Sequence, residues 1–192
     1  MRLRLAESAD APAVAAIYAP YVTASAVSFE TEAPDEGEMR SRIDAVAGSY
    51  PWIVAEEDGA LLGYAYASAF RSRPAYRFAV ETTVYLAHGA EGRGIGRRLY
   101  TLLLTTLEAQ GFTQAIAAIT LPNHASLKLH RSLGFAEAGV YTQVGYKLGQ
   151  WRSVALWQRP LARALEHPEE PRPLSAVWHE PFAADGYGQD NG

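Results

Sequence analysis

The chain has 192 residues, of which 48% are hydrophobic and 20% are charged. These fractions are typical of one globular domain with a real core, and they exclude a collagen-like or wholly disordered protein. The absence of cysteine excludes disulfides, cysteine zinc sites and covalent thiol mechanisms, and the net charge of −4 argues against a general nucleic-acid-binding protein.

No apolar run reaches the roughly 20 residues that a membrane-spanning helix needs, and the N-terminus lacks the apolar stretch of a signal peptide. We therefore expect a cytoplasmic protein with neither a nucleic-acid partner nor a membrane partner.

Helix and strand patterns alternate in the first half of the chain. The expected elements are a strand at 3–6, a helix around 14–21, a helix from about 34, and strands at 52–56 and 61–69. Ser8 or Asp10 can cap the first helix. The Asp58-Gly59 pair between the two strands predicts an antiparallel hairpin.

The second half continues the mixture. The expected elements are a strand at 78–86, a helix around 99–107, a strand at 113–119, a helix at 125–133, and strands at 135–144 and 153–158. Gly111 and Gly134 stand where the two helices should end. This order predicts an α/β or α+β protein whose mixed sheet is covered by helices on both faces.

The composition changes after Leu161, where prolines and paired acidic residues replace the periodic patterns. We divide the chain into a domain at 1–161 and a Pro-rich, partly flexible extension at 162–192. Trp178 and Phe182 are the residues that can anchor part of this extension on the domain.

A glycine-rich loop at 91–98, Glu-Gly-Arg-Gly-Ile-Gly-Arg-Arg, lies between a predicted strand and a predicted helix. Glycines let backbone N–H groups turn toward one ligand, and the helix N-terminus adds partial positive charge. The loop lacks the Gly-Lys-Ser/Thr ending of a nucleotide P-loop, and 113–119 supplies no acidic residue for a dinucleotide ribose. The pattern predicts a pyrophosphate cradle, and a mobile turn with solvated arginines is the alternative.

Several further motifs appear in a fixed order along the chain. They are Val27-Ser28-Phe29, Phe70-Arg71-x-Arg73-Pro74-Ala75-Tyr76-Arg77, Val80-Glu81-x-x-Val84-Tyr85, Gly94-x-Gly96, Asn123-x-x-Ser126, Leu129-His130-x-x-Leu133-Gly134-Phe135, and Val144-Gly145-x-Lys147-x-Gly149-x-Trp151. Together they resemble the GNAT N-acetyltransferases, and the finer pattern is similar to the phosphinothricin and amino-acid N-acetyltransferase branch. The resemblance covers about residues 2 to 160.

The resemblance implies the GNAT fold, a mostly antiparallel sheet whose two central strands splay apart. It also implies an enzyme that transfers an acetyl group from acetyl-CoA directly to a small amine, with no metal. The residues expected to hold acetyl-CoA are Val84, Tyr85, Leu86, Gly92, Arg93, Gly94, Ile95, Gly96, Arg97, Asn123 and Ser126. Asn123 has an alternative as an ordinary helix N-cap.

Glu81 and His130 are the predicted catalytic residues. An amine must lose a proton before it attacks, and a glutamate in an apolar strand has the raised pKa that suits a base. The alternatives for Glu81 are a solvent-facing carboxylate or a partner of Arg77. By resemblance, His130 protonates the leaving thiolate; a purely structural histidine is its alternative.

The acceptor site is expected just before the strand of Glu81. Arginine forks suit carboxylate, phosphinate or sulfone groups, and the expected acceptor residues are Phe29, Arg71, Arg73, Tyr76 and Tyr141. Solvated loop arginines and core aromatics are the alternatives. In this branch the late strands that carry Lys147 and Trp151 help to build a dimer, so the resemblance implies a homodimer.

Two residues depart from the family pattern. Glu91 places a negative charge beside the expected pyrophosphate, where relatives carry Gln or Arg, and Ser153 stands where relatives often carry Asp. Two other functions stay open: acetylation of another amine class, such as an aminoglycoside, polyamine or protein N-terminus, and a non-catalytic CoA-binding regulatory protein of the same fold.

Overall fold

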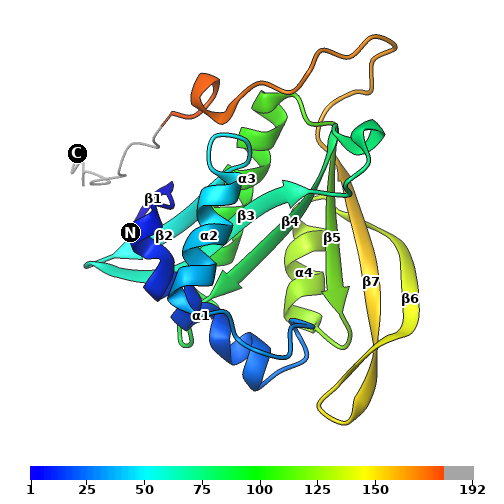
Figure 1. Ribbon diagram of the computed structural model, residues 1–192. Helices are drawn as coiled ribbons and strands as arrows, with labels where there is room; N and C mark the ends of the chain where they lie inside the picture. The colour runs from blue at the N-terminus through cyan, green and yellow to red at the C-terminus, as the bar shows by residue number, and fades with distance from the viewer. Residues whose placement is uncertain (180–192) are drawn as a thin grey trace, which may run out of the picture.

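In the computed structural model, residues 1–179 are described and form a seven-stranded mixed sheet flanked by helices (Figure 1). The strands are β1 (Arg2–Leu5), β2 (Trp52–Glu57), β3 (Ala60–Ala69), β4 (Ala79–Leu86), β5 (Gln114–Thr120), β6 (Ala136–Lys147) and β7 (Gln150–Pro160). The helices are α1 (Ala11–Thr23), α2 (Glu36–Val46), α3 (Ile95–Gln110) and α4 (His124–Ser132). Short 3₁₀ turns are η1 (Ser8–Asp10), η2 (Pro74–Tyr76) and η3 (Leu174–Ala176).

The strand order is β1-β2-β3-β4-β5-β7-β6, and every neighbouring pair is antiparallel except β4 and β5. The β2–β3 hairpin turns at Asp58 and Gly59, both with positive φ, as the Asp-Gly pair predicts. The predicted fold class, a mixed and mostly antiparallel sheet, is confirmed.

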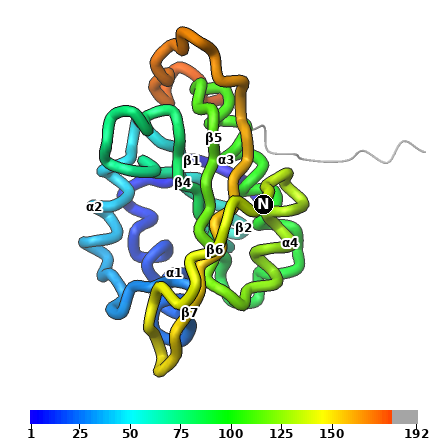
Figure 2. Tube along the Cα trace, turned by 90° about the vertical axis from the view of Figure 1, so that its right-hand side faces the viewer, coloured from blue at the N-terminus to red at the C-terminus, as the bar shows by residue number. Residues whose placement is uncertain are grey.

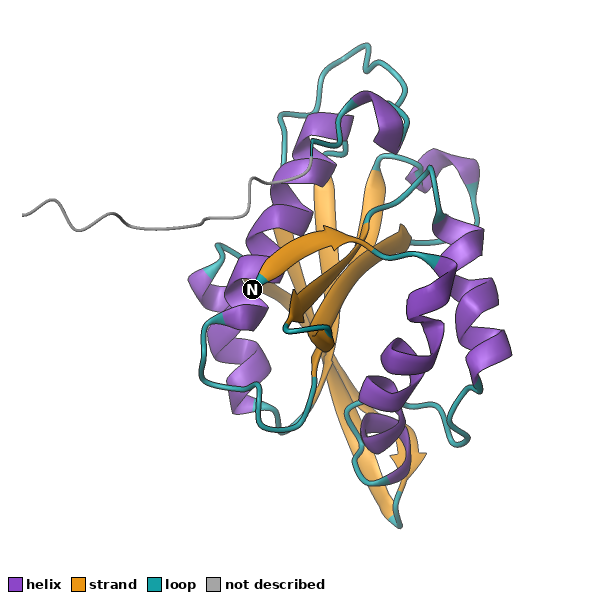
Figure 3. Cartoon of the chain, turned by 90° about the vertical axis from the view of Figure 1, so that its left-hand side faces the viewer, coloured by secondary structure: helices purple, strands orange, loops and turns teal. Residues whose placement is uncertain are grey.

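Helices cover the two faces of the sheet separately, as Figure 3 shows. On one face, α3 buries Leu99, Leu103 and Leu107 against the sheet; on the other, α1 and α2 bury Val14 and Met39. Strand periodicity divides β4 between these two cores. Its even-numbered residues therefore face α3, and its odd-numbered residues face α1.

Local chemistry fixes where the helices begin. Asp35 caps α2, because its side chain accepts a hydrogen bond from Glu38 N at 2.8 Å. At the start of α1, Asp10 occupies the N-cap position, as expected, but its side chain makes no capping hydrogen bond, because its carboxylate binds the guanidinium of Arg4 at 2.7 and 2.8 Å. An ion pair with β1 thus takes the place of the cap.

The two late strands are longer than the sequence predicts, and together they form a hairpin from Ala136 to Pro160. Alternation is lost in β6 because the register shifts between Tyr141 and Gly145 and Gln143 has positive φ. Figure 2 shows this hairpin extending beyond the helices at one end of the molecule.

Strands β4 and β5 are parallel for only three register pairs, Ala79–Gln114, Val80–Ala115 and Glu81–Ile116. Beyond Glu81 the two strands diverge, so β4 has no partner strand on its β5 side. This divergence, which the resemblance implies, opens the centre of the sheet.

The segment after β7 folds back over the far end of α3 (Figure 2). Leu174 is buried there, Trp178 packs against the α3 core, and Gln110 Nε2 donates to Arg172 O at 3.0 Å. The division into a domain at 1–161 and an extension at 162–192 stays a prediction, and Phe182 lies outside the described residues. Within 1–179, no helix is long and apolar enough to cross a membrane.

Candidate functional site

The diverging strands β4 and β5 leave a groove in the sheet, and α4 closes one side of it. Its walls include Thr82, Thr83, Val84 and Tyr85 from β4, Ala117 to Thr120 from β5, and Asn123, Ser126 and His130 around α4. Five of the residues predicted to bind acetyl-CoA or to act in catalysis therefore line this groove: Val84, Tyr85, Asn123, Ser126 and His130. A sixth, Glu81, lies at its closed end, where β4 and β5 still pair.

The glycine-rich loop enters α3 with Gly94 at the N-cap in the left-handed region, φ 77°. Gly92 also has positive φ, 75°. The first helical bond runs from Arg98 N to Gly94 O, so the N–H groups of Ile95, Gly96 and Arg97 lack helical acceptors. These N–H groups and the helix dipole are the features that the predicted anion cradle requires.

The charges around this cradle are already partly engaged. Arg93 binds the carboxylate of Glu57 at 2.6 Å, and Arg97 donates to Ser132 O at 3.3 Å. Glu91 accepts a hydrogen bond from Gly89 N at 2.8 Å, which holds its carboxylate within the loop. Arg93 therefore neutralises Glu57 in this structure, and not Glu91.

Glu81 lies on β4 at the point where the two strands separate. Its side chain is partly buried, and this burial raises the pKa of the Glu81 carboxyl. The alternative partner, Arg77, binds Glu170 at 2.8 Å. Glu81 makes no ion pair among the described residues, so its carboxyl is available as a proton acceptor beside the groove.

His130 ends a chain of buried hydrogen bonds that begins in the sheet. Thr82 Oγ1 donates to Ile116 O at 3.1 Å, and Tyr100 OH donates to Thr82 Oγ1 at 2.7 Å. His130 Nε2 lies 3.0 Å from Tyr100 OH, and its Nδ1 lies 2.8 Å from Ser126 O. Phe135 packs edge-on against the imidazole.

When Thr82 donates to Ile116 O and Tyr100 donates to Thr82, both ring nitrogens of His130 face acceptors, Tyr100 OH and Ser126 O. Only the imidazolium donates from both nitrogens. Burial lowers the pKa of His130, and the hydrogen bond to Ser126 O opposes that shift. The hydrogen bonds therefore favour the charged form and burial opposes it.

Asn123 serves as the N-cap of α4, because its Oδ1 accepts from Ser126 N at 3.1 Å. Asn123 and Ser126 also line the groove. The Ser126 hydroxyl lies 3.3 Å from His130 Nδ1, and both residues line the groove. The structural alternative for Asn123 is thus confirmed, and its position leaves the binding role open.

One of the three β4 residues predicted to pair with acetyl-CoA already has a side-chain partner. The hydroxyl of Tyr21 donates to Leu86 O at 2.8 Å and lies 3.4 Å from Leu86 N. Its ring packs on Tyr85 at 4.9 Å. Tyr21 therefore anchors the open end of β4 to α1.

The predicted acceptor residues fall into two groups in the structure. Arg71 stacks over Phe70 and Tyr76 in the β3–β4 loop, and Arg73 is exposed in the same loop. Phe29 and Tyr141 are 39% and 47% exposed. Phe29 packs so closely on β6 that a Cβ at Gly145 would lie 2.1 Å from its ring.

Lys147 is buried inside the subunit, unlike Trp151, which is 61% exposed. Its ammonium donates to Ser28 O at 2.7 Å and so ties β6 to the loop before α2. Burial lowers the pKa of Lys147, and the nearby Glu30 opposes this shift.

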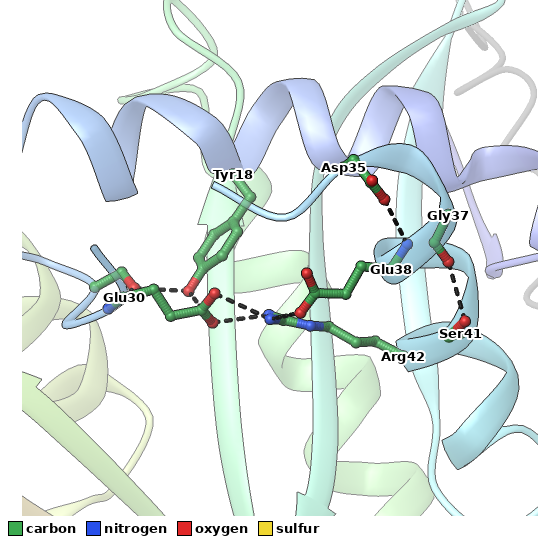
Figure 4. Close-up of polar contacts among 8 residues, drawn as sticks. Tyr18, Glu30, Asp35, Gly37, Glu38, Ser41 and Arg42 are labelled. Atoms are coloured by element: carbon green, nitrogen blue, oxygen red, sulfur yellow. Dashed lines mark hydrogen bonds and ion pairs between the residues drawn. The ribbon is translucent and has the colours of Figure 1, made fainter. Parts of the chain in front are cut away.

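Helix α2 brings a further charged cluster to the face of Glu81. The guanidinium of Arg42 binds both oxygens of Glu30 at 2.7 and 3.0 Å and also binds Glu38, and Tyr18 donates to Glu30 at 3.0 Å (Figure 4). The pKa of Arg42 is raised, above all by its hydrogen bond with Glu30. No motif in the sequence indicates this cluster.

No sequence pattern indicates the hydrogen bonds made by Thr82, Tyr100 and Tyr21 either. Tyr100 reads as one more apolar position of α3, and its contact with His130 joins segments 30 residues apart. Among residues 1–179, no group of three or more His, Asp or Glu residues could hold a metal ion.

Comparisons with known proteins agree with this geometry. Residues 3–154 match the family described as the acetyltransferase (GNAT) domain. The chain is 41% identical over 177 residues to the phosphinothricin N-acetyltransferase of Streptomyces viridochromogenes, covering 92% of this chain and 94% of that protein. It is 34% identical to an L-methionine sulfoximine/L-methionine sulfone acetyltransferase of Salmonella typhimurium, covering 84% and 95%.

Among solved structures, the phosphinothricin acetyltransferase of Sinorhizobium meliloti in complex with acetyl-CoA superposes with a TM-score of 0.84. It shares 42% sequence identity, and the match covers 88% of this chain and 92% of that one.

Proposed function

Because the chain belongs to the GNAT family and is an N-acetyltransferase, we propose that it acetylates the amine of a small amino acid analogue such as phosphinothricin, methionine sulfone or methionine sulfoximine. The observation that carries this proposal is Glu81, a carboxyl with a raised pKa and no ion-pair partner among the described residues, at the head of the groove. The names of similar proteins support the acceptor class.

The groove and the loop suit acetyl-CoA, which supplies the activated thioester when it is bound. The N–H groups at the start of α3 would hold its phosphates, with Gly92, Arg93 and Gly94 shaping the loop. The unpaired side of β4 at Val84 and Tyr85 would pair with the amide arm as a strand does. Asn123 and Ser126 face the same groove from α4.

Glu81 would take the proton of the acceptor ammonium. A free amino acid carries a protonated amine at neutral pH, and attack needs the lone pair. Burial destabilises the carboxylate of Glu81 and raises its pKa, which makes it a stronger base than an ordinary glutamate. The proton then resides on the Glu81 carboxyl, directly or through one water.

His130 would return a proton to the leaving thiolate. Its Nδ1 lies 3.3 Å from the Ser126 hydroxyl, and Ser126 lines the groove. Ser126 can pass its own proton to the sulfur and receive one from His130. The imidazolium becomes neutral in this step, and burial favours that form.

The acceptor would approach from the face of α1 and α2, on which the side chain of Glu81 lies. Arg71, Arg73 and Tyr76 lie in the loop before β4, where cationic and hydroxyl groups can bind its α-carboxylate. Phe29 and Tyr141 would wall the other side.

A homodimer and a cytoplasmic location also stay predictions. The β6–β7 hairpin supports the dimer, because large apolar side chains gather on it at 44–61% exposure: Val140, Tyr141, Val144, Tyr146, Leu148 and Trp151. Such a patch marks an interaction surface in soluble proteins.

Release of free thiol from acetyl-CoA tests the function. Methionine sulfone, phosphinothricin and the common amino acids are assayed beside a polyamine and an aminoglycoside, with the slow variant Glu81→Gln as the matched control. Turnover of the amino acid analogues alone supports the proposal. Turnover of the polyamine or the aminoglycoside alone would replace it with the other amine class.

A further inference from the structure

A cavity of about 270 Å³ lies between α2 and the β2–β3 hairpin, and none of the expected acceptor residues lines it. Its lining includes Met39, Arg42, Ala45, Trp52, Tyr66 and Ser68. The volume is close to the lower end of the range for small-molecule pockets. It therefore suits part of a small ligand, such as one side chain.

The cavity adjoins Glu81 through the sheet register. Ser68 is the direct cross-strand partner of Glu81, and Tyr66 is the partner of Thr83. Side chains of such partners lie on the same face with their Cβ atoms about 5 Å apart. An amine bound at Glu81 would thus have the mouth of this cavity beside it.

Most of the cavity wall is formed by apolar and aromatic side chains. Trp52 and Tyr66 stack with ring centroids 4.2 Å apart and an interplanar angle of 14°. Met39 is 2% exposed and adds a flexible thioether. A short, unbranched hydrocarbon chain is the ligand chemistry that these surfaces favour.

Arg42 supplies a polar group in the lining. Glu30 and Glu38 fix its guanidinium by three hydrogen bonds, all from the two terminal nitrogens. Its Nε–H and one terminal N–H make no hydrogen bond to the described residues. The two carboxylates hold the fork in place, and the remaining donors are open to a further oxygen acceptor.

We propose that this cavity binds the side chain of the acceptor, a short apolar chain that ends in sulfone, sulfoximine or phosphinate oxygens. These oxygens accept hydrogen bonds from Arg42, and the chain lies against Met39 and the Trp52–Tyr66 stack. The inference rests on the proposed function, and it leaves the arginines of the β3–β4 loop for the α-carboxylate.

Filling the cavity from its rim tests the first part of this proposal. Ala45 is exposed on α2 and lines the cavity, so Ala45→Trp blocks it without enlarging a core residue. Ala16→Trp on the exposed face of α1 is the matched control. We expect Ala45→Trp to raise the KM for methionine sulfone about 10-fold or more and to leave the KM for acetyl-CoA within about twofold of wild type. For Ala16→Trp, both KM values should stay within about twofold of wild type.

Arg42→Lys tests the second part, because lysine keeps the charge and loses the fork. The variant should weaken methionine sulfone about 10-fold, as loss of a hydrogen bond from a charged donor implies, and should leave the thioether methionine within about twofold. The subsite would be overturned if Arg42→Lys weakened methionine sulfone and methionine equally, or if neither Arg42→Lys nor Ala45→Trp changed the KM for methionine sulfone. Turnover by the wild-type enzyme would still support the proposed function in either case. Absence of turnover by the wild-type enzyme would instead remove the proposed function.

Discussion

The hydrogen-bond chain from Ile116 to His130 should affect both the free energy of unfolding and the pKa of His130. Tyr100→Phe removes one hydroxyl that bonds Thr82 at 2.7 Å and lies 3.0 Å from His130 Nε2. The ring stays, so packing against Phe135 is kept and no cavity forms. The lost interactions are polar and fully buried.

Each of the two buried hydrogen bonds contributes about 1 kcal/mol, so the variant should lose about 2 kcal/mol of unfolding free energy. For a chain of this size that loss lowers Tm by roughly 4–8 °C. Urea denaturation at pH 7.5 measures the free energy. Thr101→Val is the control, because it removes a hydroxyl at an exposed position of the same helix, and its free energy of unfolding should be unchanged.

The same substitution should lower the pKa of His130 further, because the imidazolium then has no acceptor for its Nε2 proton. Because the pKa of His130 is lower in the folded chain, only the unfolded chain binds a proton as the pH drops below the ordinary histidine pKa, and stability falls. In the variant the folded pKa is lower still, so this loss of stability should continue to lower pH. Proton NMR of the five histidine rings, assigned with His130→Gln, follows the titration. A variant with wild-type stability and an unchanged His130 pKa would refute this arrangement of hydrogen bonds.

Three further results are expected. Glu81→Gln should lower kcat about 100-fold at neutral pH. Because burial raises the pKa of Glu81, wild-type activity should begin to fall on acidification at a pH above the ordinary pKa of glutamate, and the variant should lack this acid limb of the pH profile. Glu91→Gln should lower the KM for acetyl-CoA by about two- to fivefold by removing an exposed negative charge, and an unchanged KM would show that this charge has no influence. Removing 162–192 exposes the site of Leu174, which is 5% exposed; burial of one leucine contributes about 1.5–3 kcal/mol, so Tm should fall by at least about 3 °C with an unchanged KM for acetyl-CoA.

Local patterns explain how much of this fold could be predicted. The Asp58-Gly59 turn, the capping glycine Gly111 and the amphipathic spacing of α3 act over a few residues, so the sequence indicates them directly. Strand ends in the late hairpin could not be placed, because the bulge near Gln143 breaks the alternation.

The site divides in the same way. The glycine loop and Glu81 belong to continuous motifs, and their positions follow once the strands are known. Tyr100 and Tyr21 act through partners far away in the sequence, such as Leu86, 65 residues from Tyr21, and Arg42 binds Glu30 on the loop before its own helix. Single-sequence periodicity gives each of them only a helix face, so their contacts needed the three-dimensional structure.

The short parallel joint between β4 and β5 also bears on how the molecule folds. It divides the sheet into two sets of strands, β1–β4 and β5–β7, and within each set the hairpins β2–β3 and β6–β7 close over short loops. The joint itself forms only when the whole crossover through α3 closes, and it has only three register pairs to offset that loop-closure entropy. A ligand in the groove touches both sets at once, and mass action then stabilises their association. Binding of acetyl-CoA would thus hold the two parts of the enzyme together.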